Sequence, residues 1–302
     1  IPGTGLGVLG DDSTAEAVTP LGEGIEGHDP AGSVLTIGES RAVLPVRRLT
    51  HPDLIAVRVH DDEGRLVERR LAGLFASTAY TSSVLTIPLI RDKVRAILDD
   101  AGWARRSHSG GFALRLFETF PRDELFQAPV EHLSQVVSRI LQMVHRMRTA
   151  AFLRLDSGGQ FVTAIIYLPR DRYRTAVRYR VEDELRRATG ADEVSFTAHV
   201  SDEPMARLYY ILRGSAGVRL PEGSDREELD EAITDATLTW EERLARTADE
   251  LLGQDVARDL MGPWRGGFPV DYEDDFDAAQ GVADLKNLAR LGDGPDEERF
   301  AC

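Results

Sequence analysis

Tyr167-Leu168-Pro169-Arg170-Asp171-Arg172-Tyr173 marks a change from strand to helix within seven residues. The apolar run from Phe161 to Leu168 is typical of a strand. Pro169 ends that strand, because proline has no backbone N–H to offer a sheet. Apolar positions then recur every four residues, which predicts a helix that begins near Asp171 and buries Tyr173, Val177, Val181 and Leu185.

Further elements flank this junction on both sides. The run at 151–155, a turn at 156–159 and the strand at 161–168 predict a hairpin. Strands at 194–200 and 208–212 follow the helix, whereas a strand at 112–117 and a helix at 133–147 precede the hairpin. The order over 112–214 therefore predicts a ferredoxin-like α+β fold, an antiparallel sheet with its helices on one face.

The two ends of the chain differ in character. Residues 1–32 are rich in Gly, Asp, Thr and Pro, which predicts an irregular opening segment. Extended runs at 34–37, 42–44, 54–59 and 66–71, with a hairpin turn at 61–64, lead to a helix from Pro88 to Gly102. After Gly223 the pattern is helical, and two pairs are spaced as capping boxes, Asp225 with Glu228 and Thr239 with Glu242.

Composition limits the function classes. A chain of 302 residues with 42% hydrophobic residues is long enough for two domains. Its net charge of −15 argues against nucleic acid, and no apolar run approaches the roughly 20 residues that a membrane span requires. The single cysteine, Cys302, fits a cytoplasmic location. Because the chain opens at Ile1, we expect it to be a piece of a longer protein.

Five segments together carry a family resemblance. Arranged in this order and spacing, they resemble the N-terminal regulatory region of the large bacterial NAD-dependent glutamate dehydrogenases, from about residue 33 to residue 291. The segments are Ala79-Tyr80-Thr81, Ile87-Pro88-Leu89-Ile90-Arg91-Asp92-Lys93-Val94, Ser107-His108-Ser109-Gly110, Glu118-Thr119-Phe120-Pro121-Arg122-Asp123-Glu124-Leu125-Phe126-Gln127, and Tyr167-Leu168-Pro169-Arg170-Asp171-Arg172-Tyr173.

The resemblance implies a domain order. After the irregular segment 1–32, it implies a PAS-like antiparallel sheet domain at 33–118 and an ACT-like domain of ferredoxin fold at 119–216. A helical connecting segment at 217–302 would follow, and a separate dehydrogenase domain would lie beyond it. The whole would be an α+β protein.

The resemblance also implies a role without catalysis. The parent enzyme would convert L-glutamate to 2-oxoglutarate and ammonia with NAD, whereas this piece would regulate and assemble it. No Gly-x-Gly-x-x-Gly follows a strand here, so we expect no dinucleotide cofactor in the piece, and its single cysteine and scattered histidines predict no metal site. Because the dehydrogenase domain would lie beyond Cys302, we expect no activity in the piece alone. The expected partners are its own catalytic domain, neighbouring subunits and a small amino-acid effector. The alternative is a stand-alone PAS–ACT sensor or signalling adaptor.

Three groups of residues are candidates for function. The first group is the candidate effector or interface segment Arg170, Asp171, Arg172 and Tyr173. Its arginines, with those at 174, 178 and 180, form an anion site for an acidic amino acid, or a solvated helix face that pairs with the acids at 182–184. Arg122 and Asp123 fix a domain junction, or form a plain helix-entry loop. The aromatic side chains Trp240, Trp264, Tyr272 and Phe276 are interface anchors, or a satellite core.

Overall fold

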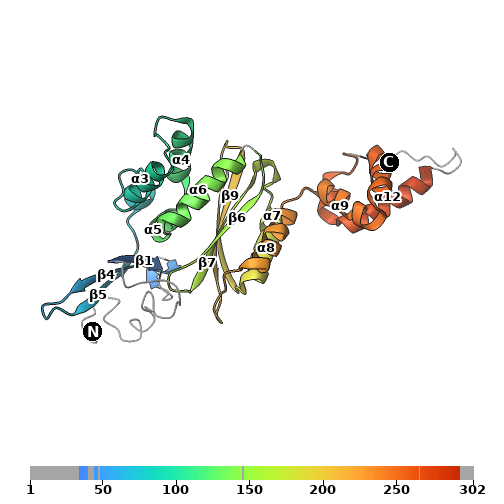
Figure 1. Ribbon diagram of the computed structural model, residues 1–302. Helices are drawn as coiled ribbons and strands as arrows, with labels where there is room; N and C mark the ends of the chain where they lie inside the picture. The colour runs from blue at the N-terminus through green and yellow to red at the C-terminus, as the bar shows by residue number, and fades with distance from the viewer. Residues whose placement is uncertain (1–33, 40–43, 47, 145, 265, 293–302) are drawn as a thin grey trace.

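A four-stranded antiparallel sheet lies at the centre of the chain, with helices on both of its faces (Figure 1). The computed structural model describes residues 34–39, 44–46, 48–144, 146–264 and 266–292. The predicted irregular segment 1–32 lies outside these described residues, as does most of the predicted strand at 42–44. A smaller sheet precedes the central one, and a cluster of helices follows it.

The first sheet has three antiparallel strands in the order β1-β4-β5. They are β1 (Leu35–Glu39), β4 (Asp53–His60) and β5 (Leu66–Gly73). The short strands β2 (Leu44–Val46) and β3 (Arg48–Thr50) pair with each other. The hairpin turn predicted at 61–64 is confirmed, because Gly64 takes a left-handed φ of 77° and its N–H donates to the Asp61 carbonyl.

Five helices come next: α2 (Ser77–Thr81), α3 (Ile90–Asp100), α4 (His108–Thr119), α5 (Arg122–Gln127) and α6 (Val130–Val144). The predicted helices at 88–102 and 133–147 are confirmed as α3 and α6. The buried residues of α3 are the four expected from its periodicity, Ile90, Val94, Ile97 and Leu98.

The prediction of a strand at 112–117 is wrong, because these residues belong to helix α4. Ser107 caps the helix, since its hydroxyl accepts from the Gly110 N–H at 3.1 Å. Ala113, Leu116 and Phe117 are buried at a spacing of three and four residues, which is the helical period. Phe112, Leu114 and Leu116 also alternate, so this short run fits either period.

The central sheet has the strand order β6-β7-β9-β8, and every neighbouring pair is antiparallel. Its strands are β6 (Ala150–Leu155), β7 (Phe161–Pro169), β8 (Glu193–His199) and β9 (Met205–Arg213). Helix α7 (Thr175–Thr189) joins β7 to β8, and β9 lies between these two strands, as in a split βαβ unit. The strand beside β7 comes from the preceding β6, and not from residues 112–117.

One face of this sheet is apolar. Helices α7 and α8 (Gly223–Ala236) cover it through residues such as Val181, Leu185 and Ile233. Alternate residues of β7 and β9 point into this core: Val162, Ala164, Ile166, Leu168, Ala206, Leu208, Tyr210 and Leu212. Burial on this scale is the main stabilising contribution to the fold.

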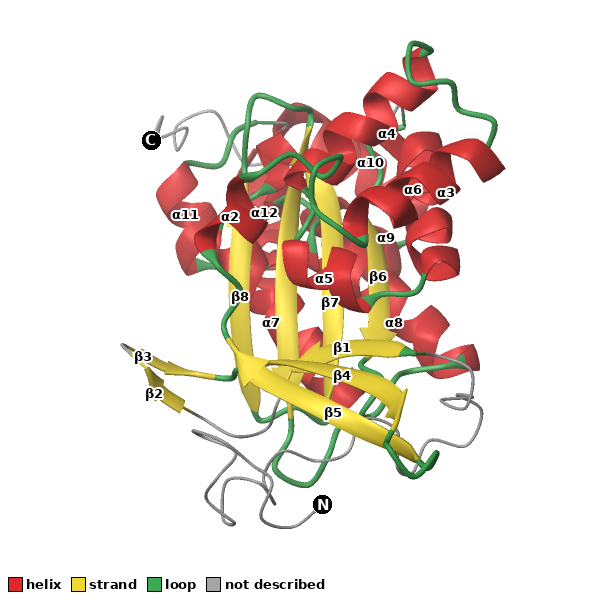
Figure 2. Ribbon diagram, turned by 90° about the vertical axis from the view of Figure 1, so that its left-hand side faces the viewer, coloured by secondary structure: helices red, strands yellow, loops and turns green. Residues whose placement is uncertain are grey.

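Helices also cover the other face, so the prediction of helices on one face only is wrong. Phe152, Ile165, Tyr167 and Tyr209 share a core with residues of α3 to α6. All of β7 is buried as a result, because it lies at the centre of the sheet with helices on both sides. Figure 2 shows α5 and α6 in front of the sheet, with β1, β4 and β5 crossing its lower end.

A helical cluster ends the described chain. It contains α9 (Trp240–Leu252), α10 (Gln254–Met261), α11 (Val270–Asp275) and α12 (Ala278–Gly292). Thr239 and Glu242 form the predicted capping box, whereas Asp225 caps nothing, because α8 begins at Gly223 after the N-cap Glu222. Trp240 is core, 5% exposed and in contact with Phe268 and Tyr272, whereas Trp264 and Phe276 are exposed.

The two ends of the central unit meet. Thr149, just before β6, and Thr237, just after α8, share a hydrogen bond of 2.7 Å between their side-chain oxygens. The chain therefore enters and leaves the β6–α8 unit at one place.

Candidate functional site

The β8 side of the sheet face beneath α5 holds a cavity of about 240 Å³, called here the β8 pocket. Ser195, Thr197 and His199 of β8 and Arg207, Tyr209 and Ile211 of β9 form its floor. These residues are directly paired across the two strands, so they project from the same face. Tyr80 of α2 and residues 121–123 form its wall, which brings both Arg122 and Asp123 to the pocket.

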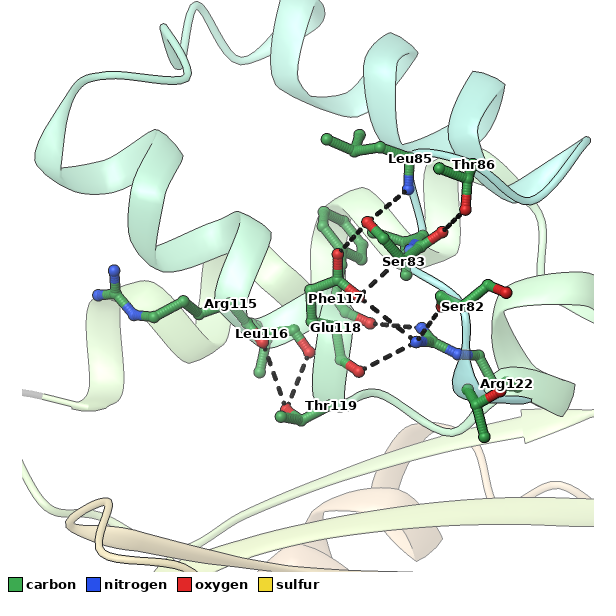
Figure 3. Close-up of polar contacts among 12 residues, drawn as sticks. Ser82, Ser83, Leu85, Thr86, Arg115, Leu116, Phe117, Glu118, Thr119 and Arg122 are labelled. Atoms are coloured by element: carbon green, nitrogen blue, oxygen red, sulfur yellow. Dashed lines mark hydrogen bonds and ion pairs between the residues drawn. The ribbon is translucent and has the colours of Figure 1, made fainter. Parts of the chain in front are cut away.

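Arg122 is bound to the end of helix α4. Its guanidinium donates to the Phe117 carbonyl at 3.1 Å, and to the Glu118 and Ser82 carbonyls at 3.2 Å each (Figure 3). These are carbonyls that a helix leaves without partners at its C-terminus, where a positive charge is favourable. Arg122 thus ties the turn between α4 and α5 to the ends of α4 and α2.

Glu118 extends this network to the loop after α2. Its carboxylate accepts from the Ser83 hydroxyl at 2.6 Å and from the Val84 N–H at 3.2 Å, and it lies 3.4 Å from an Arg122 nitrogen (Figure 3). Glu118 therefore holds the wall of the pocket through hydrogen bonds to the loop after α2 and to Arg122.

Arg207 binds the same end of α4 from the sheet side. Its Nη2 donates to the Thr119 carbonyl, and its guanidinium lies 5.9 Å from the centre of the Phe120 ring. Only 7% of Arg207 is exposed. The guanidinium groups of Arg122 and Arg207 therefore already donate to backbone carbonyls. Asp123 is the acidic side chain of the wall.

Asp123 accepts a hydrogen bond of 3.1 Å from the Tyr80 hydroxyl. Burial raises the pKa of Asp123; the bond from Tyr80 opposes this change, and the charge of Glu124 adds to it. Burial and the nearby carboxylates likewise raise the pKa of Tyr80. The hydroxyl of Tyr80 therefore stays a donor at neutral pH.

Asp123 belongs to an acid cluster with Glu39 of β1 and Asp53 of β4. Burial raises the pKa of Glu39 to about 7, against the opposing effect of Arg213, whose Nη2 lies 2.8 Å from the carboxylate. Burial also raises the pKa of Asp53 to about 6, although the Phe75 N–H donates to it at 3.0 Å. The charge of Asp123 further raises the pKa of both Glu39 and Asp53, and the charge of Asp53 further raises that of Glu39, so these two carboxylates take up protons close to neutral pH.

A buried ion pair lies behind the wall. Arg154 of β6 donates to both oxygens of Glu124 on α5, at 2.7 and 2.9 Å. Burial opposes the charge of Glu124, but the charge and hydrogen bonds of Arg154 outweigh it and hold the pKa of Glu124 below its usual range. This bidentate pair fixes α5 on the sheet. No local sequence pattern indicates this pair, because its two members are 30 residues apart.

The Arg170–Tyr173 group does not join this site. Arg170 donates to the Ser201 carbonyl at 3.1 Å, whereas Arg172 binds Glu242 of α9 at 2.7 Å. Residues 170–172 form a single 3-10 turn, and α7 begins only at Thr175. Tyr173 packs against the apolar core beside α7. The two arginines thus diverge toward different elements, and each has an acidic or carbonyl partner.

Two negative findings apply to the described residues. Within them, no helix is long and apolar enough to cross a membrane. Across the same ranges, no group of three or more His, Cys, Asp and Glu side chains has the geometry to hold a metal ion.

Comparison with protein families gives three successive matches. Residues 87–146 match glutamate dehydrogenase helical motif 1, residues 150–241 match the ACT2 domain of glutamate dehydrogenase, and residues 249–291 match helical motif 2. The β8 pocket therefore lies between the first two matched segments, because residues 121–123 belong to one and β8 and β9 to the other.

Curated relatives agree with these matches. The chain is similar to the NAD-specific glutamate dehydrogenases of Halomonas elongata (32% identical over 274 residues, 90% of this chain) and Pseudomonas aeruginosa (32% over 249 residues, 82%). It is also similar to that of Mycobacterium tuberculosis (33% over 276 residues, 86%). The chain spans 17%, 15% and 16% of these proteins, about a sixth of their length.

Proposed function

We propose a regulatory role on the premise that this chain belongs to the family of large NAD-specific glutamate dehydrogenases, which it matches along three successive segments. In this proposal the chain is a non-catalytic part of a longer enzyme. That enzyme converts L-glutamate to 2-oxoglutarate and ammonia with NAD bound in a separate domain. The chain itself holds no cofactor and has no activity alone.

The position of the β8 pocket carries this proposal. A ligand there would contact both the α4–α5 junction of helical motif 1 and the strands β8 and β9 of the ACT2 domain. Binding would then change how the two segments pack, which is the requirement for coupling a remote site to an active site. A network that fixes Arg122 and Glu118 would carry the change into α4.

The proposed effector is a small amino acid. The pocket offers the Asp123 carboxyl and hydroxyl groups from Tyr80, Ser195 and Thr197, which suit an ammonium group and a carboxylate respectively. Asp123 and Arg122 are the predicted site residues that line it. Arg170 and Arg172 are proposed to act differently, by fixing the ACT2 domain to its neighbours, since Arg172 binds α9.

The wider setting is proposed on the same premise. The partners of the chain would be its own catalytic domain and neighbouring subunits of a cytoplasmic homo-oligomer. Residues 33–118 would form the PAS-like domain, for which the antiparallel β1-β4-β5 sheet is the support. Residues 119–216 and 217–302 would form the ACT-like domain and the helical connecting segment.

The test is glutamate-dependent NADH formation by the full-length enzyme, with the 302-residue chain as the control. We expect activity only in the full-length protein. Asp123→Asn in the full-length enzyme should weaken its response to an amino-acid panel and leave the rate without effector unchanged. Asp100→Asn, an exposed change at the end of α3, is the matched control.

Three outcomes would contradict this account. Activity of the 302-residue chain alone would show that it is catalytic. Absence of activity in both proteins would favour the stand-alone PAS–ACT sensor. An equal effector response in wild type, Asp123→Asn and Asp100→Asn would remove the β8 pocket from the mechanism and leave the family assignment intact.

A further inference from the structure

The helices before the central sheet carry a basic surface in an acidic chain. Asp and Glu make up 51 of the 302 residues, yet residues 101–117 and 132–144 contain neither. Four exposed arginines lie in these two stretches, and within the described residues none of them forms an ion pair. These four, called here the basic surface, are Arg105, Arg106, Arg115 and Arg139.

The connection between α3 and α4 presents two of these arginines in a fixed loop. The Ser107 hydroxyl donates to the Ala104 carbonyl at 2.7 Å. Gly110 approaches the same carbonyl so closely that a side chain at this position would clash with it. Arg105 and Arg106 lie between these two contacts, so the loop that carries them is held in one shape. Figure 2 shows this connection at the outer edge of the molecule, away from the sheet.

The helical cluster at the end of the described chain has the opposite charge. Residues 240–292 contain 12 acidic and six basic residues. A groove of about 550 Å³, called here the acidic groove, is bordered by α9 and α10. Its wall combines apolar and acidic side chains, among them Leu244, Met261, Trp264, Phe268, Glu241 and Asp249.

Two acids of the groove are available to a cation. Asp249 is exposed, and in the part of the chain that the structure describes its carboxylate has no hydrogen bond or ion pair. Glu241 accepts the Gly266 N–H at 2.8 Å through one oxygen only. The arginine of the groove wall, Arg258, already lies 3.3 Å from Asp255. The groove therefore suits a partner that brings guanidinium groups and some apolar surface.

The basic surface and the acidic groove do not meet within one copy of the chain. Figure 1 shows α3 and α4 on one side of the central sheet and α9 and α12 on the other. Attraction between exposed charges is screened beyond about 10 Å at 0.1 M salt, so the two surfaces do not act on each other across the sheet. A contact between them requires two copies.

We propose that the basic surface of one copy docks on the acidic groove of a second copy, with Arg105 and Arg106 against Asp249 and Glu241. This inference rests on the homo-oligomer of the proposed function and names the surfaces that form it. Because the two surfaces differ, one contact leaves a free basic surface on one copy and a free groove on the other. The assembly therefore closes as a reciprocal dimer or as a ring.

The test is sedimentation velocity of the 302-residue chain at several protein concentrations, in low and in high salt. We expect self-association that weakens as the salt concentration rises, because salt screens exposed charges. Arg105→Glu combined with Arg106→Glu, and separately Asp249→Lys, should each lower the association constant by at least about tenfold. Arg69→Glu combined with Arg174→Glu changes two exposed arginines elsewhere and is the matched control, which should associate like wild type.

A mixture of the two charge variants gives the sharper result. The arginine variant keeps an intact groove, and Asp249→Lys keeps an intact basic surface. An equimolar mixture should therefore associate, although neither variant does so alone. Thermal unfolding of each variant should match that of wild type, since the substituted side chains are exposed.

Each contrary outcome overturns the proposal. A wild-type chain that stays monomeric would leave the groove to a different partner, and association that both charge variants retain would exclude these surfaces. Association that is lost in both variants and is not restored in the mixture would indicate a contact between like surfaces.

The full-length enzyme separates this inference from the proposed function. An oligomer that persists there in the arginine variant, with an unchanged effector response, would contradict the inference and leave the proposed function intact. A wild-type full-length enzyme that is monomeric would contradict the proposed homo-oligomer itself.

Discussion

The two faces of the central sheet have opposite chemistry, although both are buried by helices. On the α7–α8 face, β7 and β9 contribute apolar side chains and the tyrosine Tyr210, whose hydroxyl donates to the Arg178 carbonyl. On the α5–α6 face, the same strands and β6 contribute the buried polar residues Arg154, Thr163 and Arg207. The β8 pocket and the acid cluster also lie on that side.

We infer from this difference that the α7–α8 face mainly stabilises the fold, whereas the α5–α6 face responds to ligands and pH. The ionisable side chain that β9 contributes to the α7–α8 face, Tyr210, keeps its proton because burial raises its pKa, so this face responds little to pH or to charged ligands. The other face combines buried charges with cavities, and its packing depends on protons and on partners. A ligand or a pH change should therefore act through α5, β1 and β4, while α7 and α8 stay in place.

The largest effect should come from breaking the buried ion pair on the polar face. Glu124→Gln would leave Arg154 buried without its countercharge, which costs about 3–5 kcal/mol in the free energy of unfolding. Urea unfolding measures the change, with Glu131→Gln, an exposed acid of α6, as the control. A loss below about 1 kcal/mol would mean that Arg154 is satisfied by Gln127, 3.3 Å away.

Truncation on the apolar face should cost somewhat less. Leu208→Ala removes a side chain with 0% exposure, which lowers the free energy of unfolding by about 3 kcal/mol. The pH dependence of the free energy of unfolding and the affinity of the β8 pocket for an amino acid should not change. A change in the ligand affinity of this variant would contradict the proposed difference between the two faces, since it would show that packing on the apolar face affects the β8 pocket.

Titration of the acid cluster should give a moderate effect. Glu39 and Asp53 have pKa values in the folded state, about 7 and about 6, above their ordinary values of 4.5 and 3.8. The folded protein therefore binds protons more tightly than the unfolded chain. The stability that these two groups contribute is present at low pH and is lost as the pH rises through about 6 and 7.

Glu39→Gln isolates this contribution. The variant should become more stable relative to wild type between pH 5 and pH 8, because glutamine cannot ionise beside Asp53 and Asp123. Urea unfolding at four pH values measures the difference, and histidines present in both proteins cancel. A difference that stays constant over this range would show that Glu39 does not titrate there.

The smallest effect should come from the predicted anion site. Arg172→Ala removes an ion pair with Glu242 that is partly exposed, at 27% and 40% of the two side chains, so we expect a loss below about 1 kcal/mol. Thermal unfolding measures it, with Arg258→Ala, an exposed arginine of α10, as the control. A drop of several kcal/mol would give the α9 contact a structural role that its exposure does not suggest.

The sequence predicted the elements of the apolar face well. The periodic run in α7 and the apolar strands β7 and β9 leave little choice between helix and strand, because burial on one face fixes the period. The long run in α6, on the opposite face, was predictable for the same reason. Helix α4 was missed because its run of six residues is too short to separate the two periods. Helices on both faces of the sheet are consistent with the apolar character of all of β7, a signal that the prediction did not use.

The polar face was only partly predictable. Arg122 and Asp123 were predicted to fix a domain junction or to form a plain helix-entry loop, and both line the β8 pocket. The Glu124–Arg154 pair and the acid cluster join residues from distant parts of the chain, and no spacing rule connects Glu39 with Arg213. Such contacts follow from the folded topology, and a single sequence contains no local pattern for them.

The hydrogen bond between Thr149 and Thr237 has a consequence for how such a chain can be assembled. Since the β6–α8 unit begins and ends at one point, it can be spliced into a host protein or taken out of it without separating the host's two neighbouring segments. The matched segment 150–241 has nearly these bounds. The chain thus enters and leaves this unit at one place, whereas the unit packs on its neighbours at others, through Arg154 with Glu124 of α5 and Arg172 with Glu242 of α9.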